Sequence, residues 1–524
     1  MRMRKQRTAF FLLFLLALAA VLVLCMRMEE TSCMDVPILS EQQQEELGRY
    51  VKRDFSWDLQ VNGQRAAVDI RSSTIYIAQD IRQGTKPEEL SGTLRVNSNS
   101  VQLSFAPDEA FSDLAAAVKA GHTFKLNARY GSDKYMQYDV VFTTLPVLRI
   151  DGEAIGKNEK GKDICQGSMC LWHPMDPEMG RYSVKESHAL WNVRGGWSAT
   201  LDKTPFKLSL KNKSGANKDL SLAGLGADDD WILNPMNLDD TKLKEKLFSG
   251  LWNQSAEQVD WKENMSRGEY VEVVINQEYW GLFQLQRRVD GKFLELGDGE
   301  VLLKGCGLKG VQTAKEAYEI VYSNLPEEET YALVQAFFAG TDENLLHTDN
   351  FMDVNLFLQL GSASDNLDYR NMYYLLKETE KGYQMYLLPW DTDMSWGTVW
   401  DDENGGFVYD FETSSQQVTL RQEYAWMQQY HPELDRKMAE RWFELRETLL
   451  TMENITEILE QEQQVLEVSG AQQRDTARWG LYYEGADSPE NLYRSIEVRL
   501  AFVDAYYSQY LPYRKEARCV STGL

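Results

Sequence analysis

Hydrophobic and aromatic residues form their clearest pattern between residues 363 and 397. Two runs rich in Tyr and Leu, Met372–Lys377 and Tyr383–Leu388, are separated by a polar segment that ends at Gly382. This pattern predicts a β-hairpin. In an antiparallel pair the start of the first strand lies beside the end of the second. The residues just before Met372 should therefore meet the residues just after Leu388.

The two chain ends that the hairpin brings together are rich in acidic residues. Before the first strand stand Asp365, Asp368 and Asn371, and after the second stand Asp391 and Asp393. Crowded carboxylates repel one another unless a cation lies among them, and hard oxygen ligands of this kind suit Mg²⁺ or Ca²⁺. Trp390 and Trp396 flank the second pair and favour partial burial over the alternative, a solvated acidic turn. We therefore predict a divalent metal site here.

Basic residues that could face an anion occur in three strand-like segments. Arg194 precedes Gly195 and Gly196, and glycines let a backbone approach an anion closely. Lys207 lies in the next apolar run, and Lys304 lies in the run VLLKG. Most basic residues in such segments are simply exposed to solvent. These three are therefore candidates for phosphate binding only if the fold brings them beside the acidic cluster.

The remaining pattern divides the chain into parts. Short alternating runs separated by turn residues cover residues 66–145 and predict a small all-β sandwich for spacing or protein contact. Strands and one helix follow up to about residue 305. From residue 432 to 511 the pattern is helical, with Ser488 and Pro489 marking the start of the last helix.

The N-terminus carries a targeting pattern. A basic cluster precedes the uncharged apolar run 9–26, whose 18 residues would span roughly 27 Å as a helix. We expect an uncleaved, single-pass signal anchor in the cell membrane, with the bulk of the chain extracytoplasmic. A cleaved secretory signal is the alternative. In such an oxidising compartment Cys165 and Cys170 are close enough in sequence to form a small disulfide loop.

Length and charge limit the number of domains and the classes of binding partner that we expect. The 524 residues predict two to four domains, and 55 basic against 80 acidic residues leave a net charge of −25. This balance argues against a nucleic-acid partner, because a phosphate backbone would be repelled. The five histidines show no zinc-ligand spacing.

The order of these motifs resembles the CotH-type spore-coat protein kinase family, whose members are atypical and distantly protein-kinase-like. The resemblance covers roughly residues 145–510. Its matching segments are RGGWSATLDKTPFKLSL, VEVVINQEYWGLFQLQRRVDGKFL and, above all, NMYYLLKETEKGYQMYLLPWDTDMSWG.

The resemblance implies a role for each candidate residue. Asp391, with Asp393 close by, would hold Mg²⁺, and Lys207 would contact the phosphates of ATP. Asp365 would be the catalytic base, with Asp368 as its rival, and Asn371 a second metal or positioning ligand. The acceptor would be a Ser or Thr of a surface or coat protein.

Two segments depart from the family pattern. The loop at 194–198 is RGGWS where the family usually has RGN-S-S, and Gln286-Arg287-Arg288 stands where it tends to have T-E-Q. If the family's glutamate pairs with the phosphate lysine, Arg287 cannot replace it. The alternatives are therefore a catalytically inactive kinase-like scaffold of the cell envelope and a calcium-dependent adhesion module.

The predicted fold class is α+β, with an N-terminal transmembrane helix, a β-sandwich module and a kinase-like domain whose C-terminal part is helical. The predicted boundaries are 1–30 for the basic tip and anchor, 31–65 for a stalk, 66–145 for the β module, 146–515 for the kinase-like domain and 516–524 for a tail.

Overall fold

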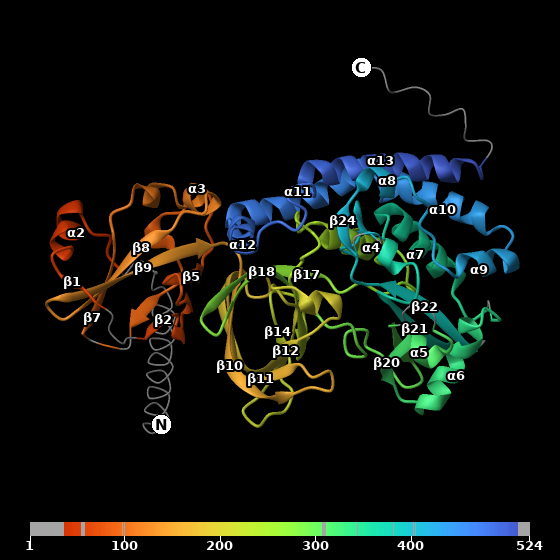
Figure 1. The fold of residues 1–524 in the computed structure, drawn as a ribbon, viewed down its shortest axis with the longest axis horizontal. Helices are drawn as coiled ribbons and strands as arrows, with labels where there is room; N and C mark the ends of the chain where they lie inside the picture. The colour runs from red at the N-terminus through yellow and green to blue at the C-terminus, as the bar shows by residue number, and fades with distance from the viewer. Residues whose placement is uncertain are drawn as a thin grey trace, which may run out of the picture.

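The computed structural model describes residues 36–53, 58–96, 98, 100–306, 311–342, 344–380, 382–401, 403 and 405–511. These residues form three parts side by side: an N-terminal module, a closed β-barrel and a larger α+β part (Figure 1). Helices of the last segment of the chain run along one side, from the barrel to the far end of the third part (Figure 1).

The N-terminal module is built on a six-stranded mixed sheet with a three-stranded sheet beside it. β5 and β1 both pair in parallel with β9, whereas β8 pairs with β7 and β9 in antiparallel fashion. Its elements are α2 (Glu41–Leu47), β1 (Val51–Lys52), β2 (Leu59–Val61), β3 (Gln64–Arg65), β4 (Ala67–Asp69), β5 (Thr74–Ala78), η2 (Pro87–Glu89), β6 (Leu94–Val96), β7 (Val101–Phe105), η3 (Glu109–Ser112), α3 (Leu114–Lys119), β8 (Phe124–Tyr130) and β9 (Lys134–Thr143).

The barrel closes in the order β10-β11-β12-β13-β16-β18-β17. Alternate residues of its strands point inward, and they fill the barrel with a core of their own. Its elements are β10 (Val147–Lys157), β11 (Asp163–Asp176), β12 (Arg181–Val193), η4 (Trp197–Thr200), β13 (Phe206–Lys211), β14 (Leu220–Ser221), β15 (Ala227–Asp228), β16 (Asp230–Asn234), α4 (Lys244–Ala256), β17 (Gly268–Ile275) and β18 (Glu278–Arg287).

The third part combines a four-stranded sheet, in the order β20-β19-β21-β22, with a set of helices and a separate two-stranded hairpin. Its elements are β19 (Val301–Gly305), α5 (Ala314–Ala317), β20 (Tyr318–Ser323), α6 (Glu327–Phe338), α7 (Thr348–Gly361), η5 (Ser364–Asn366), β21 (Met372–Thr379), β22 (Gly382–Pro389), β23 (Thr398–Asp401), β24 (Gly406–Tyr409), α8 (Phe411–Ser414), α9 (Tyr424–Tyr430), α10 (Leu434–Thr448), α11 (Met452–Ser469), α12 (Ala471–Trp479) and α13 (Pro489–Ser508).

Buried contacts join the barrel to the third part. Lys203 of the barrel lies 2.8 Å from Asp475 of α12, and both side chains are buried. Asp475 also accepts a hydrogen bond from the backbone N–H of Leu282 in β18. Helix α4 contributes to the largest hydrophobic cluster, which otherwise lies mainly in the third part. These contacts fix the position of the barrel wall relative to the acidic hairpin.

The structure corrects the predicted fold class. The α+β class is confirmed for the described residues, but none of their helices is both long and apolar enough to cross a membrane, so the predicted transmembrane helix is not found there. The run 9–26 itself lies outside the described residues. The module at 66–145 is built on a mixed sheet, because β5 and β9 pair in parallel, and helix α3 lies between β7 and β8 in the chain. Alternating runs predict strands, but they do not predict which strands pair. The domain boundaries stay a prediction.

The proposed disulfide between Cys165 and Cys170 is wrong as well. Both residues lie on β11 and both are free thiols. Five residues along a strand span roughly 16 Å, and an odd separation places two side chains on opposite faces. A disulfide needs Cα atoms about 4.4–6.8 Å apart. The two thiols therefore cannot be joined in this fold.

Candidate active site

The acidic hairpin forms as predicted. β21 pairs with β22 in antiparallel register, and Met372 lies opposite Pro389 at the open end. The backbone N–H of Trp390 donates to the carbonyl of Asn371 over 3.2 Å, which ties the two chain ends together. Asn371 and Asp391 have φ values of 50° and 56°, in the left-handed region. Asn and Asp tolerate this region better than most residues, and such conformations cluster at functional sites.

Asp365 lies at this open end, in the short helix η5. Its Oδ2 accepts a hydrogen bond of 2.7 Å from Asn371 Nδ2, and its Oδ1 lies 3.2 Å from Arg370. Burial raises the pKa of Asp365 to about 6, against the lowering effect of Arg370 and with a further rise from Asp391. A carboxyl group with this pKa is mostly ionised at neutral pH and still accepts a proton readily, as a general base requires.

Asp368, the rival for the base role, has a different environment. Both of its oxygens accept hydrogen bonds from Arg370 Nε, at 3.1 and 3.2 Å, and a second guanidinium nitrogen lies 3.1 Å away. Arg370 thus lies between Asp365 and Asp368. Because Asp368 is engaged by Arg370 on both oxygens, the geometry favours Asp365 as the base.

Three further carboxylates face the open end of the hairpin. Burial raises the pKa of Asp391 above its usual range, and Arg194 and Lys304 oppose this rise. The pKa of Asp393 is raised well above its usual range by burial and by repulsion from the neighbouring acids, Asp391 first among them. Burial and the charge of Asp391 also raise the pKa of Glu245 to about 7. Such mutual repulsion is what a divalent cation relieves.

The sequence did not single out Glu245. It stands in the first turn of α4, and Asn234 Nδ2 and Gln286 Nε2 donate to its two oxygens over 2.8 and 2.9 Å. In sequence it belongs to the charged run Lys244-Glu245-Lys246, which is typical of a solvent-exposed helix turn. The packing of α4 between the barrel and the third part buries the side chain.

Two cations lie near Asp391, beside the ring of Trp390. The guanidinium of Arg194 lies 5.3 Å and the ammonium of Lys304 lies 4.3 Å from the centre of the Trp390 ring. Burial and the nearby Arg194 lower the pKa of Lys304 to about 8, and Asp391 opposes this shift. Within the described part of the chain neither side chain forms an ion pair. Two such cations beside buried carboxylates are suited to an anionic ligand that also carries a metal ion.

Lys207 is placed differently from the prediction. Its ammonium forms an ion pair of 2.9 Å with Asp230 on the outer face of the barrel. It lies opposite Ile232 in the register of β13 and β16, and Ile232 lines a small cavity together with Glu245 and Trp390. Lys207 therefore stands on the barrel face that looks toward the site, but the cations beside Asp391 are Arg194 and Lys304.

Arg287, at the position where the family pattern has a glutamate, binds an acid of the barrel part. Its Nε donates to Asp228 over 2.9 Å, and its guanidinium lies 5.1 Å from the centre of the Phe293 ring. Glu245 instead supplies the buried carboxylate on this side of the site. Gln286, the residue before Arg287 in the chain, donates a hydrogen bond to it. The departure in sequence therefore does not leave the site without a glutamate.

A second acidic cluster lies elsewhere in the barrel part. Asp219, Asp228 and Asp229 have carboxylate oxygens within 4.8 Å of one another. Lys292 contacts all three, with its ammonium 2.7 Å from Asp219, and Arg287 also binds Asp228. These two basic side chains already offset most of the charge of the three acids, so we do not assign the cluster a metal.

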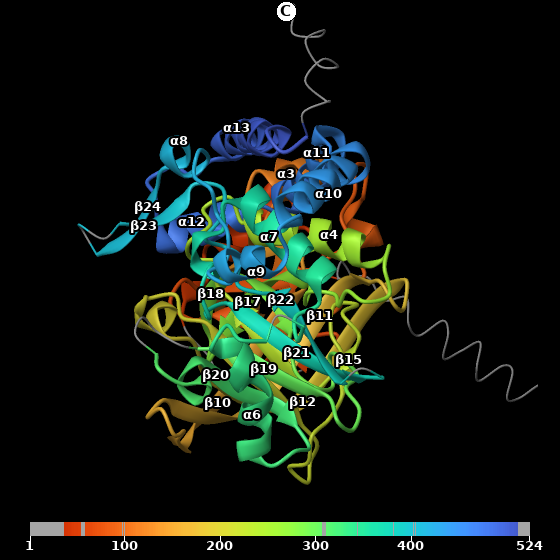
Figure 2. The ribbon, with the colours of Figure 1, turned by 90° about the vertical axis from the view of Figure 1, so that its right-hand side faces the viewer.

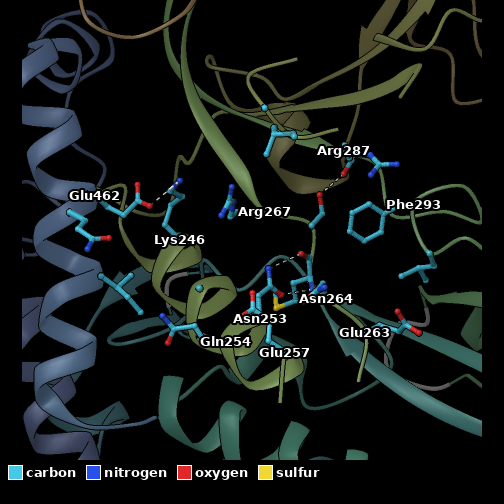
Figure 3. A pocket seen from close by; sticks show the side chains of 18 of the residues that line it. Lys246, Asn253, Gln254, Glu257, Glu263, Asn264, Arg267, Arg287, Phe293 and Glu462 are labelled. Carbon is cyan, nitrogen blue, oxygen red and sulfur yellow. Dashed lines mark hydrogen bonds and ion pairs between the residues drawn. The ribbon is translucent and has the colours of Figure 1, made fainter. Parts of the chain in front are cut away.

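Two sizeable cavities are lined by different sets of residues. A cavity of about 760 Å³ lies between α4, α11 and the end of β18, and Figure 3 shows its polar lining. Lys246 in this cavity pairs with Glu462 over 3.1 Å, and none of the predicted site residues lines it. A cavity of about 610 Å³ is lined by Asp365 and Arg370. Of these two cavities, the second lies at the acidic hairpin.

The comparison with protein families agrees with the arrangement of these residues. A family model described as CotH kinase protein matches residues 192–503, more than half of the chain. This chain belongs to the CotH kinase family. The resemblance noted from the sequence is thus confirmed, and the matched region of this CotH family member contains every site residue discussed above. No curated protein matches the chain significantly.

Proposed function

We propose that this protein is a kinase that transfers the γ-phosphoryl group of ATP, with Mg²⁺, to a Ser or Thr hydroxyl of a protein. One observation carries the proposal: crowded buried carboxylates face two cations that form no ion pair within the described part of the chain. Family membership supports it. An envelope or coat protein as acceptor, and an extracytoplasmic location, stay predictions from the sequence.

The donor set fits a magnesium nucleotide. Asp391 and Asp393 offer oxygen ligands; burial raises the pKa of both, and repulsion from neighbouring acids raises that of Asp393 further, an effect that a bound cation would offset. Bound Mg²⁺ would neutralise charge on the phosphates. Arg194 and Lys304 would hold phosphate oxygens, because both are basic side chains that lie beside the same tryptophan. Asn371 would position Asp365 through its hydrogen bond.

Asp365 would orient the acceptor hydroxyl and take its proton. The hydroxyl oxygen forms a bond to the γ-phosphorus, the bond from that phosphorus to the bridging oxygen of ADP breaks, and the proton leaves through the Asp365 carboxylate. The Asn371 amide fixes the rotamer of Asp365, and Arg370 favours its ionised form. Both neighbours prepare the carboxylate for this role.

Thermal denaturation of the full chain tests nucleotide binding without knowledge of the acceptor. We expect ATP with Mg²⁺ to raise the melting temperature more than either alone, because a ligand that binds the native state stabilises it. Asp391→Asn should abolish this rise in melting temperature. Asp133→Asn, an exposed acid in the N-terminal module, is the matched control and should keep it.

Two other results would contradict the proposal. A rise with Ca²⁺ alone would favour the adhesion module, in which nearby cations serve no purpose. No response to any ligand would favour the inactive scaffold. Transfer of radiolabelled γ-phosphate from ATP to casein or to the chain itself then separates a binding protein from an enzyme.

A further inference from the structure

The cavity in front of Asp365 lies on the acceptor side of the site. Its volume is about 610 Å³, within the range of cavities that hold ligands, and Asp365 and Arg370 line it. Arg194, Lys304 and Trp390 are not among its lining residues. This cavity therefore gives an acceptor hydroxyl a route to Asp365.

Aromatic side chains from two different parts of the fold form the far wall. Trp197 comes from the loop that also carries Arg194, whereas Trp400 and Phe407 are paired across the hairpin β23–β24. The ring centre of Phe407 lies 4.6 Å from that of Trp197 and 4.9 Å from that of Trp400. The hairpin projects from the third part (Figure 2).

The two tryptophans of this wall are more exposed than is usual for their size. Trp197 is 38% and Trp400 43% exposed, although tryptophan is one of the more buried residue types. They lie together around a cavity next to a candidate catalytic group, which an isolated exposed side chain does not explain. Met394 and Val399 extend the apolar surface.

The charged groups of this cavity are already engaged. Arg370 pairs with Asp365 and Asp368, and Asp410 caps helix α8 by accepting from the backbone N–H of Thr413 over 3.0 Å. Uncharged polar residues, among them Ser364, Thr413 and Gln417, line the rest of the cavity, and the aromatic residues give it one apolar wall. Selectivity here would come from apolar contact.

We propose that this cavity is the acceptor site and that it selects a Ser or Thr in a protein segment that carries a large apolar side chain beside the acceptor. This inference rests on the proposed kinase function. The acceptor hydroxyl would lie at Asp365, and the neighbouring apolar side chain would lie against Trp197, Trp400 and Phe407. The aromatic residues would act in binding, not in proton transfer.

A positional-scanning peptide library tests the proposal with the full chain, ATP and Mg²⁺. Each peptide has one Ser, and one neighbouring position at a time is fixed as Leu, Phe, Gly, Lys or Glu. We expect Leu or Phe at one position to raise kcat/KM about tenfold over Gly, since burial of a large apolar side chain favours binding by at least that factor. Trp400→Ala and Phe407→Leu should reduce this preference by raising KM for the apolar peptide.

Control measurements separate the possible outcomes. Tyr430→Ala removes an exposed aromatic residue of α9 outside the cavity and should keep the preference. Melting temperature with ATP and Mg²⁺ shows whether each variant is folded. Transfer by the wild type without any apolar preference, or a preference unchanged in both cavity variants, would overturn this proposal alone. Failure to transfer to every peptide would overturn the proposed function and this proposal with it.

Discussion

Asn371 Nδ2 donates a hydrogen bond of 2.7 Å to Asp365 Oδ2, and this contact joins the first residue before the hairpin to the candidate base. Asn371 also holds the second chain end, because its carbonyl accepts from the backbone N–H of Trp390. One residue in a left-handed conformation thus connects the base to the segment that carries Asp391. The candidate base and the segment with the candidate metal ligands are therefore positioned by the same residue.

Substitution of the two candidate bases should have different effects. We expect Asp365→Asn to lower kcat for phosphoryl transfer by about 10²–10⁴-fold, the usual contribution of a general base, and to leave nucleotide binding intact. Asp368→Asn should lower kcat by less than about tenfold, because Arg370 already binds the Asp368 carboxylate on both oxygens. Single-turnover transfer and nucleotide titration measure the two properties. A larger loss in Asp368→Asn would reverse the assignment.

Arg370 should set the pH dependence of transfer. The pKa of Asp365 is about 6, and Arg370 lowers it. A general base acts when it is ionised, so kcat should fall as pH decreases through this value. In Arg370→Gln the loss of the nearby positive charge should move this acidic limb upward by about one pH unit. A pH profile between about 5 and 8 measures the shift, and an unchanged limb in the variant would contradict the role of Asp365.

The three candidate phosphate-binding side chains should differ in how much they contribute to ATP binding. Lys304→Met and Arg194→Met should each raise KM for ATP by about tenfold or more, because both groups lie beside Trp390 and Asp391. Lys207→Met should have a smaller effect, since its ammonium pairs with Asp230. Isothermal titration with ATP and Mg²⁺ measures the affinities. If Lys207→Met is the most damaging of the three, the barrel must shift on nucleotide binding so that Lys207 leaves Asp230.

Glu245 should make stability depend on pH. Its pKa is raised from 4.5 to about 7 in the folded chain, so the folded state binds more protons than the unfolded state between these values. By linkage the free energy of unfolding decreases as pH rises through this window. Relative to Glu245→Gln, the wild type should lose up to ~3 kcal/mol between pH 4.5 and 7.5. Denaturant titrations of both proteins across this range measure the difference.

Metal binding provides the control for the last prediction. Saturating Mg²⁺ with ATP should reduce the difference in pH dependence between wild type and Glu245→Gln, because a cation among the carboxylates relieves their repulsion. The same difference with and without ligand would show that Glu245 does not sense the charge at Asp391.

The sequence by itself determined the hairpin and its chemistry. Alternating apolar residues define β21 and β22, and pairing of neighbouring strands is local, so the meeting of Asp365 with Asp391 follows from strand register. The helical start at Ser488 and Pro489 is likewise a local signal, and the Ser488 hydroxyl caps α13 as predicted. The motif order also sufficed to predict the family.

Only the tertiary structure decided which charged side chains complete the site. Lys207 and Lys304 look alike in sequence as single lysines in apolar strands, but Asp230 engages the first and the acidic hairpin faces the second. Glu245 becomes part of the site because α4 packs between the barrel and the third part. Barrel closure and the engagement of Arg287 by Asp228 depend on residues far apart in the chain. Local patterns determine strands and turns, whereas the partner of a charge depends on long-range packing.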